Sequence, residues 1–115
     1  IPTDADFVFD LRSLPNPYWT TKLRGLNGTD QEVQHFLDAQ PKYIEMFEDI
    51  RAFLARWIPH YRDANRGYLT VANGCTGGQH RTVYMTEKLA AALRDRREPI
   101  LTRHNSLPEH RLRPD

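Results

Sequence analysis

The sequence predicts an α/β fold in which a small, mostly parallel sheet is flanked by helices. Short apolar runs rich in β-branched and aromatic residues alternate with longer stretches of helical periodicity, in the order strand, helix, strand, helix, strand. Strands separated by helices generally pair in parallel through right-handed crossovers. The length of 115 residues fits one domain. We expect that domain to cover 1–105 and the proline-containing segment 106–115 to be a flexible tail.

The first elements follow from local patterns. The run 7–11, FVFDL, is apolar and aromatic and predicts a buried strand. Two prolines in 14–19, LPNPYW, exclude a helix there and predict an ordered loop. Thr29 and Glu32 have the spacing of a capping box, so we expect a short helix from that point through Leu37.

A long helix is expected after Pro41, where apolar residues recur every three or four positions and form one stripe. The stripe consists of Ile44, Phe47, Ile50, Leu54, Trp57, Ile58 and Tyr61. We assign it to the core, and Pro59 should kink or end the helix. The next strand is predicted over 68–72, followed by a helix from about Gln79 to Arg96 and a weaker third strand over 99–102.

Composition narrows the class of protein. The 16 basic and 15 acidic residues give a net charge of +1, so no global attraction to nucleic acid is expected, although the second half is rich in arginine. A single cysteine, Cys75, cannot form an internal disulfide, which makes the cytoplasm the expected compartment. We expect neither a membrane segment nor a leader. A start at Ile1 without methionine indicates a fragment of a longer protein.

The segment 74–82, GCTGGQHRT, joins a predicted strand to a predicted helix. Its three glycines allow close approach of a ligand, and the amides at a helix start favour an oxyanion such as phosphate. Arg81 can add a bidentate donor, and Thr76 and Thr82 add hydroxyls. We therefore predict a site for a phosphorylated small molecule. A tight turn whose glycines serve packing alone is the structural alternative.

The carboxyl ends of parallel strands lie at one edge of the sheet, and ligands usually bind beyond that edge. We therefore expect the residues that follow the other strands to lie near this loop. Asp10 to Tyr18 and Arg103-His104 both fall at such ends. The candidate ligand-binding residues are Arg12, Asn16, Tyr18, Asn73, Cys75, Thr76, Gly77, Gly78, Gln79, His80, Arg81, Thr82 and His104. No His/Cys spacing in the chain matches a metal site, and none is expected.

The segment 74–82 matches some known phosphate-binding loops better than others. A nucleoside-triphosphate P-loop requires a lysine where Arg81 stands, and a dinucleotide loop has a different glycine spacing. Cys75, five residues and then Arg81 match the spacing of cysteine-dependent phosphatases, which leaves a phosphatase as the alternative function. Gly74 occupies the position where those enzymes usually carry histidine, and Asp10 is the evident candidate for their general acid.

The motifs GCTGGQHRT at 74–82 and FDLRSLPNPYW at 9–19, with Arg103-His104, resemble the C-terminal domain of the RapZ family. The resemblance covers residues 6–104, and the family commonly has histidine at the position of Tyr18. It implies a fold like a phosphofructokinase subdomain and a non-enzymatic regulatory domain without a cofactor of its own.

The resemblance also implies ligands and partners. It points to glucosamine-6-phosphate on residues 75–82, and to small regulatory RNAs that are presented to an endoribonuclease. Full-length members carry an N-terminal P-loop nucleotide-binding domain and form homo-oligomers, as dimers or tetramers. The candidate RNA-binding residues here are Arg81, Arg103, Arg111 and Arg113.

Overall fold

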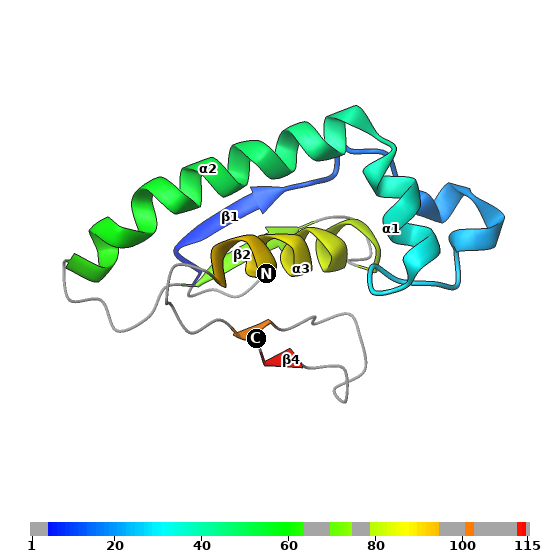
Figure 1. Cartoon of the computed structure of the whole chain (residues 1–115). Helices are drawn as coiled ribbons and strands as arrows, with labels where there is room; N and C mark the ends of the chain where they lie inside the picture. Colours follow the sequence, from blue (N-terminus) through cyan, green and yellow to red (C-terminus); the bar gives the residue numbers. More distant parts are fainter. Residues whose placement is uncertain (1–4, 64–69, 75–78, 95–100, 103–112, 115) are drawn as a thin grey trace.

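The computed structural model describes residues 5–63, 70–74, 79–94, 101–102 and 113–114. Its architecture is α/β, as predicted, with the helices and the sheet arranged as Figure 1 shows. In chain order the elements are β1 (Phe7–Asp10), the 3-10 turns η1 (Pro17–Trp19) and η2 (Thr21–Leu23), α1 (Gln31–Asp38), α2 (Pro41–Asp63), β2 (Val71–Gly74), α3 (Arg81–Leu93), β3 (Leu101–Thr102) and β4 (Arg113–Pro114).

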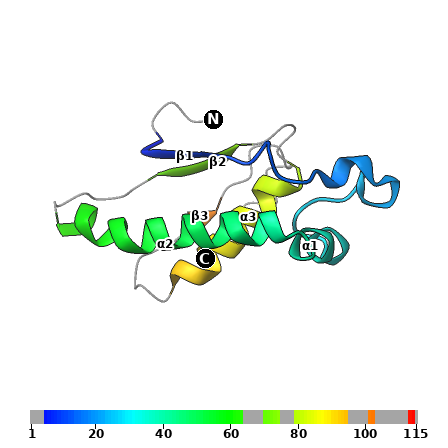
Figure 2. The same ribbon diagram turned by 90° about the horizontal axis from the view of Figure 1, so that it is seen from above.

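The strands β1 and β2 form a parallel pair, with Phe7 opposite Val71 and Asp10 opposite Gly74. Both long helices, α2 and α3, lie on the same side of this pair (Figure 2). Alternate side chains of β1 point towards them: the rings of Phe7 and Phe9 lie 5.2 and 5.9 Å from the ring of Phe53 on α2. The sheet and the helices therefore share one core, and the carboxyl ends of β1 and β2 lie at one edge.

The predicted third strand does not join this parallel pair. Leu101–Thr102 pairs antiparallel with Arg113–Pro114 in a separate two-stranded sheet. Arg113–Pro114 are the only described residues of the predicted tail 106–115, and they form this second strand. A strand of two residues carries no periodicity from which its partner can be inferred, which explains the wrong assignment.

The helix α1 begins one residue later than the capping-box pattern suggests. Its N-cap is Asp30, and no side chain caps it. The Thr29 hydroxyl instead donates to Asn27 Oδ1 at 2.6 Å, and Asp30 Oδ2 accepts from the Asn27 amide at 2.8 Å. The capping box is therefore wrong, because the Asn27 turn takes the polar groups that the box would have used.

Two expectations for α2 also change. The helix continues through Pro59 to Asp63 rather than ending there. Ile50 and Leu54 are buried as predicted, but Trp57, which we assigned to the core, is 38% exposed. The strands β1 and β2 have four residues each, so they are too short to cover the whole apolar stripe of a 23-residue helix that runs along them (Figure 1).

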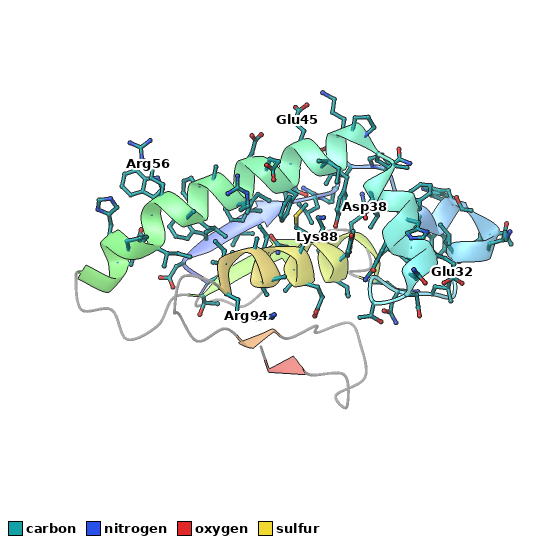
Figure 3. All side chains as sticks on the ribbon, viewed as in Figure 1. Glu32, Asp38, Glu45, Arg56, Lys88 and Arg94 are labelled. Atoms are coloured by element: carbon teal, nitrogen blue, oxygen red, sulfur yellow. The ribbon has the colours of Figure 1, made fainter. Side chains whose placement is uncertain are left out.

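A set of polar contacts within the core ties the three helices together. Tyr43 of α2 is fully buried, and its hydroxyl donates to the Arg81 carbonyl at 2.7 Å. Its ring stacks on that of Tyr84 at 6.0 Å, and the Tyr84 hydroxyl donates to the Asp38 carboxylate. Burial, followed by this hydrogen bond, raises the pKa of Tyr84. Figure 3 shows Asp38 of α1 near Lys88 of α3, with 3.6 Å between Oδ1 and Nζ.

None of the described helices combines the length with the apolar composition that a membrane span needs.

Candidate functional site

The candidate site lies where the carboxyl ends of β1 and β2 meet the start of α3 (Figure 1). Asp10 and Gly74 are the paired last residues of the two strands, and the Leu11 amide donates to the Gly74 carbonyl at 2.7 Å. The α3 helix begins at Arg81, seven residues after Gly74. Two of the three strand ends that we expected to meet therefore share this edge, whereas β3, which precedes Arg103-His104 in the sequence, belongs to the separate sheet.

Part of the predicted site lies outside the described residues. This holds for Cys75, Thr76, Gly77, Gly78, Arg103, His104 and Arg111. Of Arg113 only its place in β4 is described.

The positive end of the α3 dipole lies among buried residues, from His80 at 4% exposed to Tyr84 at 9% exposed. The N-cap residue of α3, His80, makes no capping hydrogen bond through its side chain, and the first turn contains no acidic residue. The first amides of a helix have no acceptor within the helix, and they lie at the positive end of its dipole. A negatively charged group bound there would satisfy donors that the helix itself leaves open.

The Arg81 side chain, in contrast, faces the protein. It is only 3% exposed, and its Nη1 donates to the carbonyls of Leu11, Arg12 and Leu14 at 3.2, 3.0 and 2.8 Å. This arrangement differs from the predicted bidentate ligand contact and from a contact with RNA. The turn that follows β1 needs donors for its inward carbonyls, and Arg81 supplies them. Arg81 therefore fixes the shape of the 11–14 turn.

His80 and Gln79 are also committed to main-chain acceptors. The His80 ring is 4% exposed, and its Nε2 lies 2.9 Å from the Leu23 carbonyl oxygen. The Gln79 carboxamide donates to the carbonyls of Arg24, at 3.0 Å, and Leu26. We had expected both side chains to contact the ligand. The structure instead uses them to attach the 23–26 segment to the start of α3.

Gly28 is a residue of this region that the sequence analysis did not single out. Its amide donates to the Gln79 carbonyl at 2.9 Å. A Cβ at this position would lie 2.5 Å from the Tyr84 amide nitrogen and 2.6 Å from the His80 carbonyl oxygen. Only glycine can bring its backbone this close to the first turn of α3. The Asn27-Gly28 dipeptide, a common turn sequence, was the available hint.

Arg12 and Asp10 form an exposed ion pair at the same edge. The distance from Arg12 Nη2 to Asp10 Oδ2 is 2.7 Å, and the two side chains are 69% and 56% exposed. Hydrogen bonds from the Arg12 side chain, and then from its amide, lower the pKa of Asp10 to about 2. A lowered pKa means that Asp10 stays a carboxylate until the pH falls through that value. It therefore has no proton to donate near neutrality.

This protonation state bears on the phosphatase alternative. A general acid works best when its pKa lies near the operating pH, and the pKa of Asp10 is far below it. Asp10 was the general acid that the sequence suggested for a cysteine-dependent phosphatase. The ion pair with Arg12 therefore favours the carboxylate form of Asp10.

The remaining predicted residues lie around the edge in different settings. The Asn73 carboxamide donates to the Thr86 hydroxyl of α3 at 3.0 Å, and Thr82 is 8% exposed. Asn16 Oδ1 accepts from the Tyr18 amide at 3.0 Å, which caps η1, while the Tyr18 side chain is 44% exposed. In the part of the chain that the structure describes, no three His, Cys, Asp or Glu residues gather as metal ligands would.

Two buried polar atoms near this edge lack a protein partner. They are Asn73 Oδ1 and Arg81 Nε, and neither has a hydrogen bond in the described structure. Buried polar atoms are normally paired, and exceptions often mark a functional position. Arg81 belongs to the predicted binding loop 74–82, and Asn73, which directly precedes it, was a candidate ligand-binding residue.

Comparison with known proteins agrees with the motifs. Residues 1–108 match the family described as the RapZ C-terminal domain. Relatives named nucleotide-binding proteins, from Burkholderia mallei (strain SAVP1) and Burkholderia pseudomallei (strain K96243), are 55% identical over 108 residues. The match covers 94% of this chain and 36% of each relative, so the chain spans about a third of their length. The chain therefore belongs to the RapZ C-terminal domain family.

Proposed function

We propose that this chain is a regulatory domain without catalytic activity that binds a sugar phosphate, glucosamine-6-phosphate in the first instance, at the carboxyl edge of β1 and β2. The observation that carries the proposal is the start of α3, which has neither a side-chain cap nor an acidic residue in its first turn. The family resemblance supports the choice of sugar. The relatives' name refers to proteins almost three times as long, so nucleotide binding is not proposed for this domain.

The phosphate would bind main-chain amides at the start of α3, and Arg12 would add a positive charge. Arg12 uses Nε and Nη2 for Asp10, and no described residue accepts from its Nη1. Arg81 has an indirect role in this proposal, because it holds the carbonyl of Arg12 and thereby places that residue at the edge.

Calorimetry with glucosamine-6-phosphate tests the proposal. The protein should bind it, whereas glucosamine without phosphate should give no heat of binding. Arg12→Ala should weaken binding by roughly tenfold or more, since a hydrogen bond to a charged group is worth about 1.5–3 kcal/mol.

Arg51→Ala is the matched control, because Arg51 forms a similar ion pair with Glu48 on α2. This variant should bind as the wild type does. Absence of binding to the wild type, or equal binding of glucosamine, would contradict the proposal.

A second candidate function is the binding of small regulatory RNA for presentation to an endoribonuclease. The segment 11–29 contains three basic residues and no acidic residue. Two of these, Lys22 and Arg24, are exposed, and no described carboxylate lies within ion-pair distance of either. Positive charge that no carboxylate neutralises favours a phosphate backbone. The homo-oligomer and the cytoplasmic location stay predictions.

A further inference from the structure

The segment 17–24, which we call the aromatic loop, exposes a tryptophan. Trp19 is 76% exposed, more than any other large apolar side chain that the structure describes, and the neighbouring Tyr18 is 44% exposed. Tryptophan is among the side chains that gain most from removal from water, and exposed examples are enriched at binding surfaces. The aromatic loop is therefore a candidate interaction surface.

The loop is held in place despite this exposure. Two residues of the loop, Pro17 and Leu23, are buried, and the Arg24 side chain donates to the Tyr18 carbonyl at 3.1 Å. The Leu23 carbonyl is fixed by His80 of the α3 start. A ring carried on a fixed backbone loses less entropy on binding than one on a flexible chain.

The rings of the loop are combined with positive charge. The ring of Trp19 is perpendicular to that of Tyr18 at 5.4 Å, and the Arg24 guanidinium lies 4.8 Å from the Tyr18 ring centroid. Lys22 lies between these residues in the chain and is exposed. Flat rings that stack on bases, together with cations that attract phosphates, are the means by which proteins bind single-stranded nucleic acid.

We propose that the aromatic loop is a platform for unpaired RNA, on which Trp19 stacks against a base while Lys22 and Arg24 contact the flanking phosphates. This inference rests on the second candidate function and names the surface that performs it. Protein interfaces are depleted in lysine, whereas Lys22 belongs to the same short loop as the two rings.

The chain offers a matched control. Trp57 on α2 is the other of its two tryptophans, it is 38% exposed, and the Arg56 guanidinium lies 5.2 Å from its ring centroid. The two sites thus have the same kinds of side chain in different parts of the fold. Trp57→Phe also leaves Trp19 as the sole tryptophan and as a direct fluorescent reporter.

The experiment titrates the Trp57→Phe protein with a single-stranded oligoadenylate of about ten nucleotides, a length within the range that one small domain covers. Trp19 fluorescence should be quenched on binding. Fluorescence anisotropy of the labelled oligonucleotide should then show that Trp19→Ala raises Kd by roughly 5- to 100-fold, while Trp57→Ala leaves it unchanged. An abasic oligomer of equal charge should bind wild type and Trp19→Ala equally.

Other outcomes overturn the inference in distinguishable ways. If the oligonucleotide binds without quenching, and Trp19→Ala binds as well as wild type, the platform is wrong while RNA binding stands. If no oligonucleotide binds, both fail, and the calorimetry with glucosamine-6-phosphate is unaffected. If Trp19→Ala changes only the sedimentation behaviour, the ring belongs to a protein contact, and the RNA assignment is overturned.

Discussion

Arg81→Ala is expected to lower the free energy of unfolding by about 3 kcal/mol or more, because it leaves buried carbonyls without a donor. The Nη1 of Arg81 serves the carbonyls of Leu11, Arg12 and Leu14, all in the turn that follows β1. Loss of the side chain would also leave a cavity under that turn. Denaturant unfolding, followed by circular dichroism, measures the effect as a lower midpoint.

Two further variants separate structure from ligand contact. Arg12→Ala removes an exposed guanidinium at the same edge and should leave the unfolding midpoint unchanged. Arg81→Lys keeps the charge but not the planar geometry and should fall between wild type and alanine. If Arg81→Ala unfolds like the wild type and yet has lost ligand binding, Arg81 is a direct ligand contact, and the structural role assigned to it is wrong.

Gly28→Ala is expected to destabilise the domain by about 2–3 kcal/mol, because the new methyl group would overlap a rigid backbone. The clashing atoms are the Tyr84 amide nitrogen and the His80 carbonyl oxygen, at 2.5 and 2.6 Å from the added Cβ. Neither can move without shifting the first turn of α3. Equilibrium unfolding in denaturant is again the measurement.

Gly25→Ala is the control for this prediction. A Cβ at Gly25 would meet no atom within 4 Å, and the residue is exposed. The free energy of unfolding of the Gly25→Ala variant should stay within about 0.5 kcal/mol of the wild-type value. Equal free energies of unfolding of the two variants would show that the 27–30 turn can move without loss of stability. Gly28 would then not be needed to pack this turn against α3.

Elements whose origin is local could be predicted from the sequence. The apolar and aromatic run 7–11 correctly placed β1, and the periodicity of 79–96 placed α3, although their ends shifted by a few residues. The parallel pairing of β1 with β2 followed from the helices between them. Because parallel strands end at a common edge, the meeting of these two strand ends followed as well.

Features that depend on distant parts of the chain could not be predicted. The sequence showed that Arg81 is a strong donor, but its acceptors are carbonyls about 70 residues earlier in the chain. Every residue has the same main-chain carbonyl, so no sequence pattern identifies the carbonyls that face the core. The contacts of His80 and Gln79 with the 23–26 segment have the same origin.

The exposure of particular helix residues could not be predicted from the sequence either. Periodicity identified the apolar stripe of α2, yet Trp57 is half-exposed while Tyr43, outside the predicted stripe, is fully buried. Burial is decided by what lies opposite each turn of the helix. Two described strands cover the central turns, and Tyr84 of α3 covers Tyr43.

Amide chemical shifts under added glucosamine-6-phosphate test the central claim most directly, with the start of α1 as an internal control. That helix also lacks a side-chain cap, but it carries the acidic Glu32 in its first turn. Resonances of Gln79 to Val83 and of Arg12 should move, those of Gln31 to Val33 should not, and glucosamine alone should move neither. Shifts at both helix starts, or none at the start of α3, would contradict a phosphate site at this edge.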